Sequence, residues 1–308
     1  MNVIFMGTPE FSVPCLERLI TDGHTVSLVV TQADKPKGRG QKLTPPPVKE
    51  CALQHGIPVL QPSSLRAAET QEELRRCQPD LIVVVAYGKI LPREVLELPK
   101  HGCINVHASL LPRYRGAAPI QWAVINGEKQ SGVTTMFMDV GLDTGDMLLK
   151  SAVEITDEMT AGELHDALSL GGAELLSRTI EALEAGTLTR TPQNDEESCY
   201  APMLDKSLCA MDLSKTAQAL HDQVRGLSPW PVATVERGGK KLKIHRTRVA
   251  GSCDAAVGTV VSTDPLCVAC GEGTLLEIVE VQAEGGKRMA ASAYFCGHPV
   301  TVGEAFAD

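Results

Sequence analysis

Short apolar runs alternate with helix-like stretches along the first half of the chain. Between the runs, apolar residues recur at helical spacing, as in Leu16, Leu19 and Ile20 ahead of Gly23. Continuous apolar strands separated by helices are typical of a mainly parallel sheet with helices on both faces. We therefore predict an α/β, Rossmann-like N-terminal domain. Its predicted strands are residues 3–6, 25–31, 81–86, 103–107 and 132–138.

Two helix starts carry the residues of a capping box. Thr70 with Glu73 precedes Leu74, and Thr160 with Glu163 precedes a long apolar helix face that ends at Gly186. In a capping box the first side chain accepts from a backbone N–H while the second reaches back to the first residue. We expect both pairs to begin helices.

The pattern of apolar and polar residues changes in the second half of the chain. Residues 188–206 are polar with two prolines, which predicts a linker. Ser214 then opens a predicted helix that ends at Gly226, and closely spaced strands with glycine turns follow. This succession favours a small, OB-like β-barrel. Its predicted strands are residues 232–235, 241–245, 258–262, 266–270 and 275–281. The predicted domains are 1–187, a linker 188–206, and 207–308.

Composition and charge narrow the class of protein. The 308 residues are 43% hydrophobic and 22% charged, which excludes global disorder. A net charge of −9 excludes a uniformly basic nucleic-acid-coating protein. From Lys206 onward 11 basic and 11 acidic residues balance, so the negative charge belongs to the first domain. A basic cluster in the neutral part is either a solvated hairpin or a phosphate-binding patch. Its members are Arg237, Lys240, Lys241, Lys243, Arg246 and Arg248.

The ten scattered cysteines and the N-terminus favour a reduced compartment. No secretory signal and no run of eighteen apolar residues is visible, so we expect a cytoplasmic protein with thiols that act as small core residues. Cys267 and Cys270 have metal-ligand spacing. However, they lie in a predicted strand, where positions i and i+3 face opposite sides, so we expect no metal there.

The turn after the first strand does not predict nucleotide binding. Gly7-Thr8-Pro9-Glu10 lacks the second and third glycines of a dinucleotide motif, and no phosphate-loop lysine follows. Nicotinamide or ATP binding is therefore unsupported.

The polar residues best suited to chemistry lie at the ends of two predicted strands. Asn105 and His107 lie two residues apart and so share a face at the carboxyl end of a strand, where α/β folds place their sites. The loop Asp139–Asp146 carries three acids and two glycines after another strand. One of its carboxylates is suited to orient the imidazole of His107 and stabilise its cation. A calcium loop is the alternative, but the spacing misses that of an EF-hand.

Two motifs resemble a known family. Residues 105–116, Asn-Val-His-Ala-Ser-Leu-Leu-Pro-Arg-Tyr-Arg-Gly, resemble the signature of folate-dependent formyltransferases, and residues 139–145 resemble their second signature. The resemblance implies Asn105, His107 and Asp143 as catalytic residues. The insertion at residues 34–43 narrows the similarity to family members that formylate methionyl initiator tRNA.

The resemblance implies a reaction and its participants. 10-Formyltetrahydrofolate would donate its formyl group to the α-amine of methionyl initiator tRNA, with no metal. Asn105 would donate hydrogen bonds to the oxygen as it becomes negative, while His107 and Asp143 would stabilise it and relay a proton.

Binding residues are implied in the same way. The implied folate residues are Ser109, Leu110, Leu111, Pro112, Ile90, Leu91 and Val140. The predicted tRNA-binding residues are Arg39, Lys42, Lys241 and Lys243. Ordinary core packing is the alternative role of Ile90 and Leu91. Because no self-complementary apolar helix face stands out, we expect a monomer.

Two other functions stay open at this stage. Another folate enzyme, such as a sugar-amine formyltransferase or a formyl-folate hydrolase, would share Asn105, His107 and Asp143 but would not need the Arg39 loop. A non-enzymatic RNA-binding protein would have no need of those three residues together.

Overall fold

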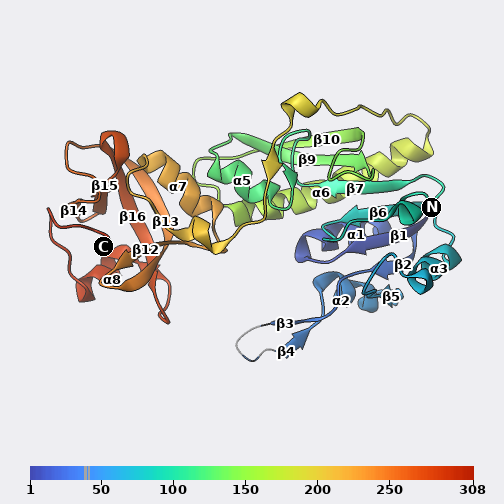
Figure 1. Cartoon of the computed structure of the whole chain (residues 1–308), viewed down its shortest axis with the longest axis horizontal. Coiled ribbons are helices and arrows are strands. Elements are labelled where there is room, and N and C mark those ends of the chain that lie inside the picture. Colours follow the sequence, from blue (N-terminus) through green and yellow to red (C-terminus); the bar gives the residue numbers. More distant parts are fainter. Residues whose placement is uncertain (38–39, 41) are drawn as a thin grey trace. The chain divides into compact units, whose positions relative to one another are not determined.

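The chain folds into two compact units (Figure 1). The computed structural model describes residues 1–37, 40 and 42–308. The first unit comprises residues 1–119, 131–153 and 165–201, and the second comprises residues 120–130, 154–164 and 202–308. Two stretches from the middle of the chain therefore pack with its C-terminal part.

A seven-stranded sheet forms the centre of the first unit. Its strand order is β10-β9-β7-β6-β1-β2-β5. The strands from β7 to β5 run parallel, whereas β9 is antiparallel to β7. The mainly parallel α/β sheet is thereby confirmed. The strands are β1 Asn2–Gly7, β2 Thr25–Val30, β5 Val59–Leu60, β6 Leu81–Val85, β7 Cys103–His107, β9 Gln130–Phe137 and β10 Met147–Glu154.

Helices flank this sheet, and α1 and α6 coincide with stretches whose apolar spacing predicts a helix. The long helix α6 begins with the predicted capping box, because Thr160 N donates to Glu163 Oε2 at 2.8 Å and Glu163 N donates to Thr160 Oγ1 at 3.2 Å. The helices are α1 Val13–Thr21, α2 Pro47–Gln54, α3 Ala68–Arg76, α4 Arg93–Leu96 and α6 Ala161–Glu184.

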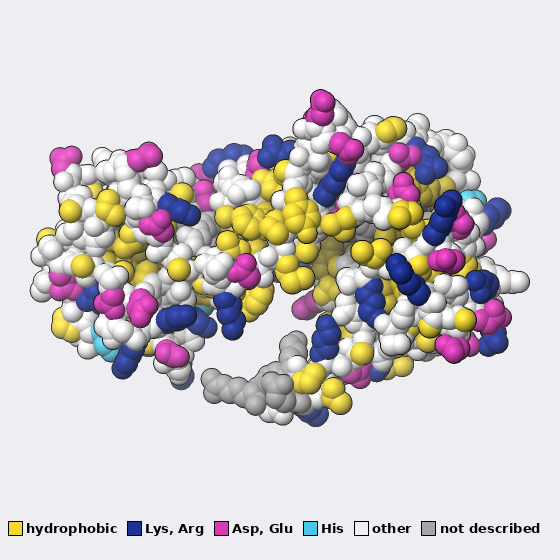
Figure 2. All heavy atoms as spheres, viewed as in Figure 1, with side chains coloured by type: hydrophobic (Ala, Val, Ile, Leu, Met, Phe, Trp, Pro, Cys, Tyr) yellow, Lys and Arg dark blue, Asp and Glu magenta, His cyan; other side chains and the backbone are white. Residues whose placement is uncertain are grey.

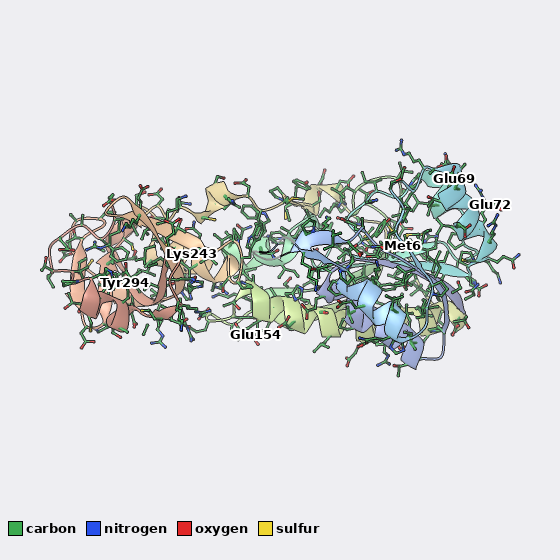
Figure 3. All side chains as sticks on the ribbon, turned by 90° about the horizontal axis from the view of Figure 1, so that it is seen from below. Met6, Glu69, Glu72, Glu154, Lys243 and Tyr294 are labelled. Atoms are coloured by element: carbon green, nitrogen blue, oxygen red, sulfur yellow. The ribbon has the colours of Figure 1, made fainter. Side chains whose placement is uncertain are left out.

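The other predicted capping box is wrong. Helix α3 begins at Ala68 after Ala67, whose side chain makes no cap hydrogen bond, so Thr70 lies inside the helix. Glu69 and Glu72 lie on α3 at the rim of the unit (Figure 3). The N-cap is Ala67 and not Thr70, so the helix starts three residues earlier than the motif indicates. Glu69 suits this first turn, where the helix dipole favours acids.

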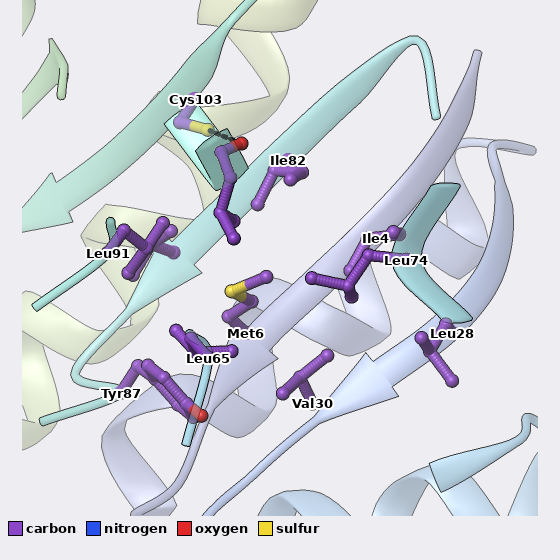
Figure 4. Packing of buried hydrophobic residues seen from close by; sticks show 12 residues of the cluster. Ile4, Met6, Leu28, Val30, Leu65, Leu74, Ile82, Tyr87, Leu91 and Cys103 are labelled. Atoms are coloured by element: carbon purple, nitrogen blue, oxygen red, sulfur yellow. Dashed lines mark hydrogen bonds between the residues drawn. The ribbon is translucent and has the colours of Figure 1, made fainter. Parts of the chain in front are cut away.

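One face of the sheet carries a continuous hydrophobic core (Figure 4). Ile4, Ile82 and Cys103 form one row across three strands, and Met6 and Val84 belong to the next row. That second row continues into Asn105, which pairs with Val84. Since side chains alternate along a strand, Asn105 and His107 point to the same face as this core, at its carboxyl edge.

The opposite face of β7 is covered by α6. A Cβ atom built on Gly172 would lie only 3.1 Å from Val106 Cγ1, so helix and strand are closely packed there. Val106 thus faces α6, while its neighbours Asn105 and His107 face away from it. The polar pair is positioned by a strand that is buried along its full length.

Burial makes two core thiols unreactive. It raises the pKa of Cys15 and the pKa of Cys103 to about 12. At pH 8 about 10⁻⁴ of such a thiol is thiolate, the reactive form. We predict that iodoacetamide at pH 8 alkylates the exposed Cys296 well before Cys15 or Cys103. Peptide mass spectrometry over time measures this, and equal rates at Cys103 and Cys296 would contradict the buried placement.

The polar segment after β2 contains a hairpin. Strands β3 Lys35–Lys37 and β4 Lys42–Thr44 pair antiparallel, with Lys37 opposite Lys42. Lys42 is exposed. Arg39, predicted to contact tRNA, lies outside the described residues.

The predicted linker carries ordered structure. A 3₁₀ turn spans Asp195–Glu197, and β11 Tyr200–Ala201 pairs in parallel with β8 Arg115–Gly116. Residues up to 201 pack with the first unit. Polar composition therefore does not make this segment a free connection, because its backbone finds partners in the loop after β7.

The second unit is built on an antiparallel sheet of order β12-β13-β16-β15-β14, with β17 added to β16. This confirms an antiparallel C-terminal sheet; an OB-like barrel stays a prediction. No helix among the described residues is long and apolar enough to cross a membrane. The elements are α5 Pro119–Ile125, α7 Ala217–Gly226, β12 Ala233–Arg237, β13 Lys240–Ser252, β14 Val260–Thr263, β15 Leu266–Ala269, β16 Thr274–Ala283, β17 Met289–Ala290 and α8 Ala291–Gly297.

The predicted start of α7 at Ser214 is wrong by two residues. Thr216 is the N-cap, and its side chain accepts from Ala219 N. Ser214 instead donates its hydroxyl to Asp212 Oδ1 at 2.6 Å. Two hydroxyl residues in close succession both suit a cap, and the sequence alone does not tell which one is used.

Candidate active site

Asn105 and His107 are brought to one place by β7. Both side chains are buried although both are polar. Buried polar groups normally have hydrogen-bond partners, and His107 Nε2 lies 2.9 Å from Tyr114 O. Among the described residues no partner contacts the carboxamide of Asn105. A buried carboxamide without protein partners is available to bind a ligand.

The contact with Tyr114 fixes the protonation pattern of His107. A carbonyl oxygen only accepts, so Nε2 must carry a hydrogen and donate it. In the neutral ring Nδ1 then holds a lone pair. Nδ1 lies 3.7 Å from Asp143 Oδ2, which is longer than a hydrogen bond. A proton gained at Nδ1 would face the Asp143 carboxylate.

The loop after β9 aims Asp143 at His107. Asp143 has a φ of 53°, in the left-handed region that side-chain-bearing residues seldom adopt. Its Oδ2 atom accepts from Gly116 N at 2.9 Å. Gly145 is required two residues later, because a Cβ there would lie 1.8 Å from Phe137 O. The structure thus brings Asp143 to within 3.7 Å of His107, on the strand that also carries Asn105, and backbone contacts from the loop after β7 hold both side chains. Their catalytic roles stay a prediction.

A second group of contacts holds residues 109–112 against β9. Thr134 is fully buried; it donates its hydroxyl to Ser109 O at 2.7 Å and accepts from Leu111 N at 3.1 Å. Lys150 Nζ donates to Leu111 O at 2.5 Å. Ser109 Oγ donates to Arg113 O at 2.6 Å, so this hydroxyl is engaged within the loop. Sequence reasoning missed Thr134, although a threonine inside a predicted buried strand is a signal worth following.

Three of the apolar residues predicted to contact folate, Ile90, Leu91 and Val140, differ in exposure. Ile90 is 76% exposed and Val140 is 66% exposed, whereas Leu91 is 3% exposed and packs in the core (Figure 4). Large exposed hydrophobic side chains are available to a planar ligand, whereas Leu91 supports the chain beside Ile90. Leu110 is half-buried, and Leu111 packs with Met136 and Met147.

Gln193 is a further member of the site that sequence reasoning missed. Its Nε2 atom donates to Asp143 O at 2.7 Å and to Gly145 O at 2.8 Å. It lies in the stretch that polar composition assigned to a linker, so no periodic signal singled it out. Within the described part of the chain, no cluster of three or more histidine, cysteine or acidic residues is placed to hold a metal.

In the basic cluster of the second unit, the arginines and the lysines differ in their ion pairs. Arg237 pairs with Glu304 at 2.7 Å, Arg246 with Glu158 at 3.3 Å, and Arg248 with Glu277 at 3.9 Å. The three lysines Lys240, Lys241 and Lys243 are exposed and have no carboxylate within 4 Å among the residues the structure describes.

Lys241 and Lys243 alternate with the buried Leu242 and Ile244 along β13. They therefore project from one face of that strand. Figure 3 labels Lys243. On the molecular face drawn in Figure 2, lysine and arginine side chains are otherwise interspersed with acidic ones.

Comparison with known proteins assigns both halves of the chain. The family described as formyl transferase matches residues 1–180, and the formyl transferase C-terminal domain matches residues 203–299. A protein of Acetivibrio thermocellus named methionyl-tRNA formyltransferase is 53% identical over 308 residues, covering 99% of each chain. One of Trichlorobacter lovleyi with the same name is 52% identical over 304 residues, covering 98% of this chain and 96% of the relative.

Solved structures of similar fold are more distant in sequence. The sugar 3N-formyl transferase WlaRD, crystallised with dTDP and 5-N-formyl-THF, has a TM-score of 0.69 at 18% identity, covering 93% of this chain and 99% of its own. HypX from Aquifex aeolicus, in complex with tetrahydrofolic acid, has a TM-score of 0.65 at 17% identity, covering 96% of this chain and 47% of its own. Because the family matches cover both halves and a relative over nearly the full length is 53% identical, the chain belongs to the formyl transferase family.

Proposed function

We propose that this chain transfers the formyl group of 10-formyltetrahydrofolate to the α-amine of methionyl initiator tRNA, which supplies formylmethionyl-tRNA for translation initiation. Relatives that share half of its residues over nearly their full length carry the name methionyl-tRNA formyltransferase. The observation that carries the proposal is local: His107 Nδ1 lies 3.7 Å from Asp143 Oδ2, beside the buried carboxamide of Asn105, which has no hydrogen-bond partner among the described residues.

The proposed transfer follows from the chemistry of a formamide. The amine nitrogen attacks the formyl carbon, the carbonyl oxygen becomes negative, and the bond from carbon to N10 of the folate then breaks. The amine loses a proton and N10 gains one. Asn105 donates hydrogen bonds to the oxygen at the moment it becomes negative. His107 takes up and returns the proton, and Asp143 stabilises the cation that forms meanwhile.

The folate is placed by elements around the same strand end. We assign Ser109, Leu110, Leu111 and Pro112, together with the exposed Ile90 and Val140, to its binding site. Leu91 acts as support beneath them because its side chain is buried in the core. Folate is a co-substrate here, and no metal takes part in the proposed steps.

The tRNA is bound in this proposal by the lysines Lys42, Lys241 and Lys243 and by Arg39 of the insertion. The unpaired lysines of β13 support this assignment, because a lysine already held by a carboxylate has less to gain from a phosphate. We further infer that residues 207–308 are the tRNA-binding domain, that their sheet closes into an OB-like barrel, and that the protein is a cytoplasmic monomer.

Reversing two of these charges tests the tRNA contact. We expect Lys241→Glu with Lys243→Glu to weaken tRNA binding about tenfold or more and to lower the slope of log Kd against log salt by about 2. Arg75→Glu with Arg76→Glu is the matched control, since it changes the net charge equally at exposed positions of α3. Unchanged affinity across the salt series in the β13 variant would remove Lys241 and Lys243 from the interface.

The identity of the formyl acceptor decides between the proposed function and that of other formyl transferases. Purified protein with 10-formyltetrahydrofolate should produce formylmethionyl-tRNA from charged initiator tRNA, and should act far less on elongator methionyl-tRNA. A nucleotide-linked amino sugar is the competing acceptor, since distant structures of the same fold are sugar formyl transferases. Formylation of the sugar and not of the tRNA would refute the proposal.

A further inference from the structure

The stretch of chain between the two segments matched by the family contacts the candidate active site. The first match ends at residue 180 and the second begins at residue 203. Residues 193–201 within this gap, called the strap below, pack with the first unit. They contact the loop after β7, whose Tyr114 O binds His107, and the loop that carries Asp143.

Gln193 binds these two loops through both the nitrogen and the oxygen of its side-chain amide. Nε2 donates to Asp143 O at 2.7 Å and to Gly145 O at 2.8 Å, and Oε1 accepts from Arg115 Nε at 3.0 Å. Carbonyl oxygens only accept and the guanidinium only donates, so the amide orientation is unambiguous. Arg115 is held in turn by Asp195, at 2.8 Å from Nη2 to Oδ1.

The remainder of the strap fixes the loop after β7. Cys199 O accepts from Arg115 N at 2.9 Å, Cys199 Sγ accepts from Tyr114 N at 3.2 Å, and Ala201 O accepts from Ala117 N at 2.9 Å. These bonds fix the backbone on both sides of Tyr114 O, which binds His107, and of Gly116 N, which binds Asp143.

The Asp143 loop needs such support. Asp143 is in the left-handed region, with a φ of 53°, and backbone held there costs free energy unless its surroundings impose it. The hydrophobic residues of the loop provide little anchoring, since Val140 is 66% exposed and Leu142 is 52% exposed. The two bonds from Gln193 hold the loop on either side of Thr144.

We propose that Gln193 is a positioning residue for formyl transfer, which keeps the Asp143 carboxylate directed at His107. This inference rests on the proposed function. Gln193 acts through Asp143 and touches neither substrate. Its loss lets the loop relax from the strained conformation, so the chemical step slows while the substrates bind as before.

Two variants separate this role from a structural one. Gln193→Ala removes both donors and the contact to Arg115. Gln193→Glu keeps the size of the side chain and the pairing with Arg115, but its carboxylate does not donate to the two carbonyls. We expect both to lower kcat about 10- to 30-fold, as the loss of two hydrogen bonds allows, with KM for tRNA and folate nearly unchanged. Glu196→Gln, exposed on the same turn, is the matched control and should keep full activity.

A double variant tests whether Gln193 acts through Asp143. In an Asp143→Asn background, adding Gln193→Ala should lower kcat no further, because the group it positions is already neutralised. Full activity of Gln193→Glu, or additive losses in the double variant, would overturn the inference and leave Gln193 as a structural anchor for Arg115.

A crystal structure of Gln193→Ala decides the geometry without any activity assay. We expect the separation of His107 Nδ1 and Asp143 Oδ2 to increase beyond its present 3.7 Å, with the remainder of the sheet unchanged. An unaltered separation overturns the inference. If instead the proposed function is wrong, the wild-type protein will not formylate tRNA. The distance in the crystal structure still tests the role of Gln193 in that case.

Discussion

Replacement of His107 by alanine is expected to lower kcat for formyl transfer by about 10³-fold, within the range that a lost proton-transfer group produces. The imidazole is suited to take up and return a proton in the proposed transfer. Its Nε2 donates to Tyr114 O and its Nδ1 faces Asp143. Single-turnover assays with saturating substrates measure the effect.

The control for His107→Ala is another histidine. His55→Ala changes an exposed ring at the end of α2 and should leave kcat unchanged. His107→Ala also leaves Tyr114 O without its partner, so thermal unfolding and folate binding must be measured for both variants. A folded His107→Ala protein that retains folate binding and more than a tenth of the wild-type kcat would refute the proposed proton transfer.

Asn105→Ala should lower kcat by about 10²- to 10³-fold, the usual cost of removing one donor from an oxyanion site. The carboxamide lies in the row that runs from Met6 through Val84, with Met136 on its other side. Donors in such apolar surroundings act more strongly than in water, because the local dielectric is low. The loss should appear in kcat and in kcat/KM alike, since the charge exists only in the transition state.

Asn105→Asp sharpens this test. It keeps the size of the side chain but replaces both donors by acceptors, so it should be at least as inactive as Asn105→Ala. If either variant raised KM for folate and left kcat intact, Asn105 would be a ground-state binding residue, and the oxyanion role would be wrong.

Much of the first unit could be predicted from the sequence because its strands are buried on both faces. Continuous apolar runs such as Leu81–Val85 have few competing interpretations, and their order along the chain indicates a parallel sheet. Helix starts were less certain. Thr70 and Ser214 suit a cap chemically, but α3 and α7 begin at other residues, since several neighbouring positions satisfy the same local rule.

The candidate site was predictable where neighbours in sequence are neighbours in space. Asn105 and His107 share a strand face, so their spacing alone places them together. Asp143 joins them through the strand pairing of β7 with β9 and a bond to Gly116, which motif resemblance anticipates but spacing does not.

Gln193 was not predictable at all. Its partners Asp143 and Gly145 lie some fifty residues away in the sequence, and a single glutamine in a polar stretch has no period or motif to mark it. The basic cluster shows a similar limit. In the sequence the six basic residues look alike. In the structure Arg237, Arg246 and Arg248 have carboxylate partners, whereas the three lysines have none within 4 Å in the part of the chain that is described.

The central claim is that Asn105, His107 and Asp143 surround one formyl group. A crystal structure of this protein with a stable 10-formyl folate analogue tests it most directly. We predict that the formyl oxygen lies within hydrogen-bonding distance of the Asn105 carboxamide nitrogen, with the His107 ring alongside and the pterin near residues 109–112. An analogue that binds with its formyl group remote from Asn105 and His107 would contradict the account.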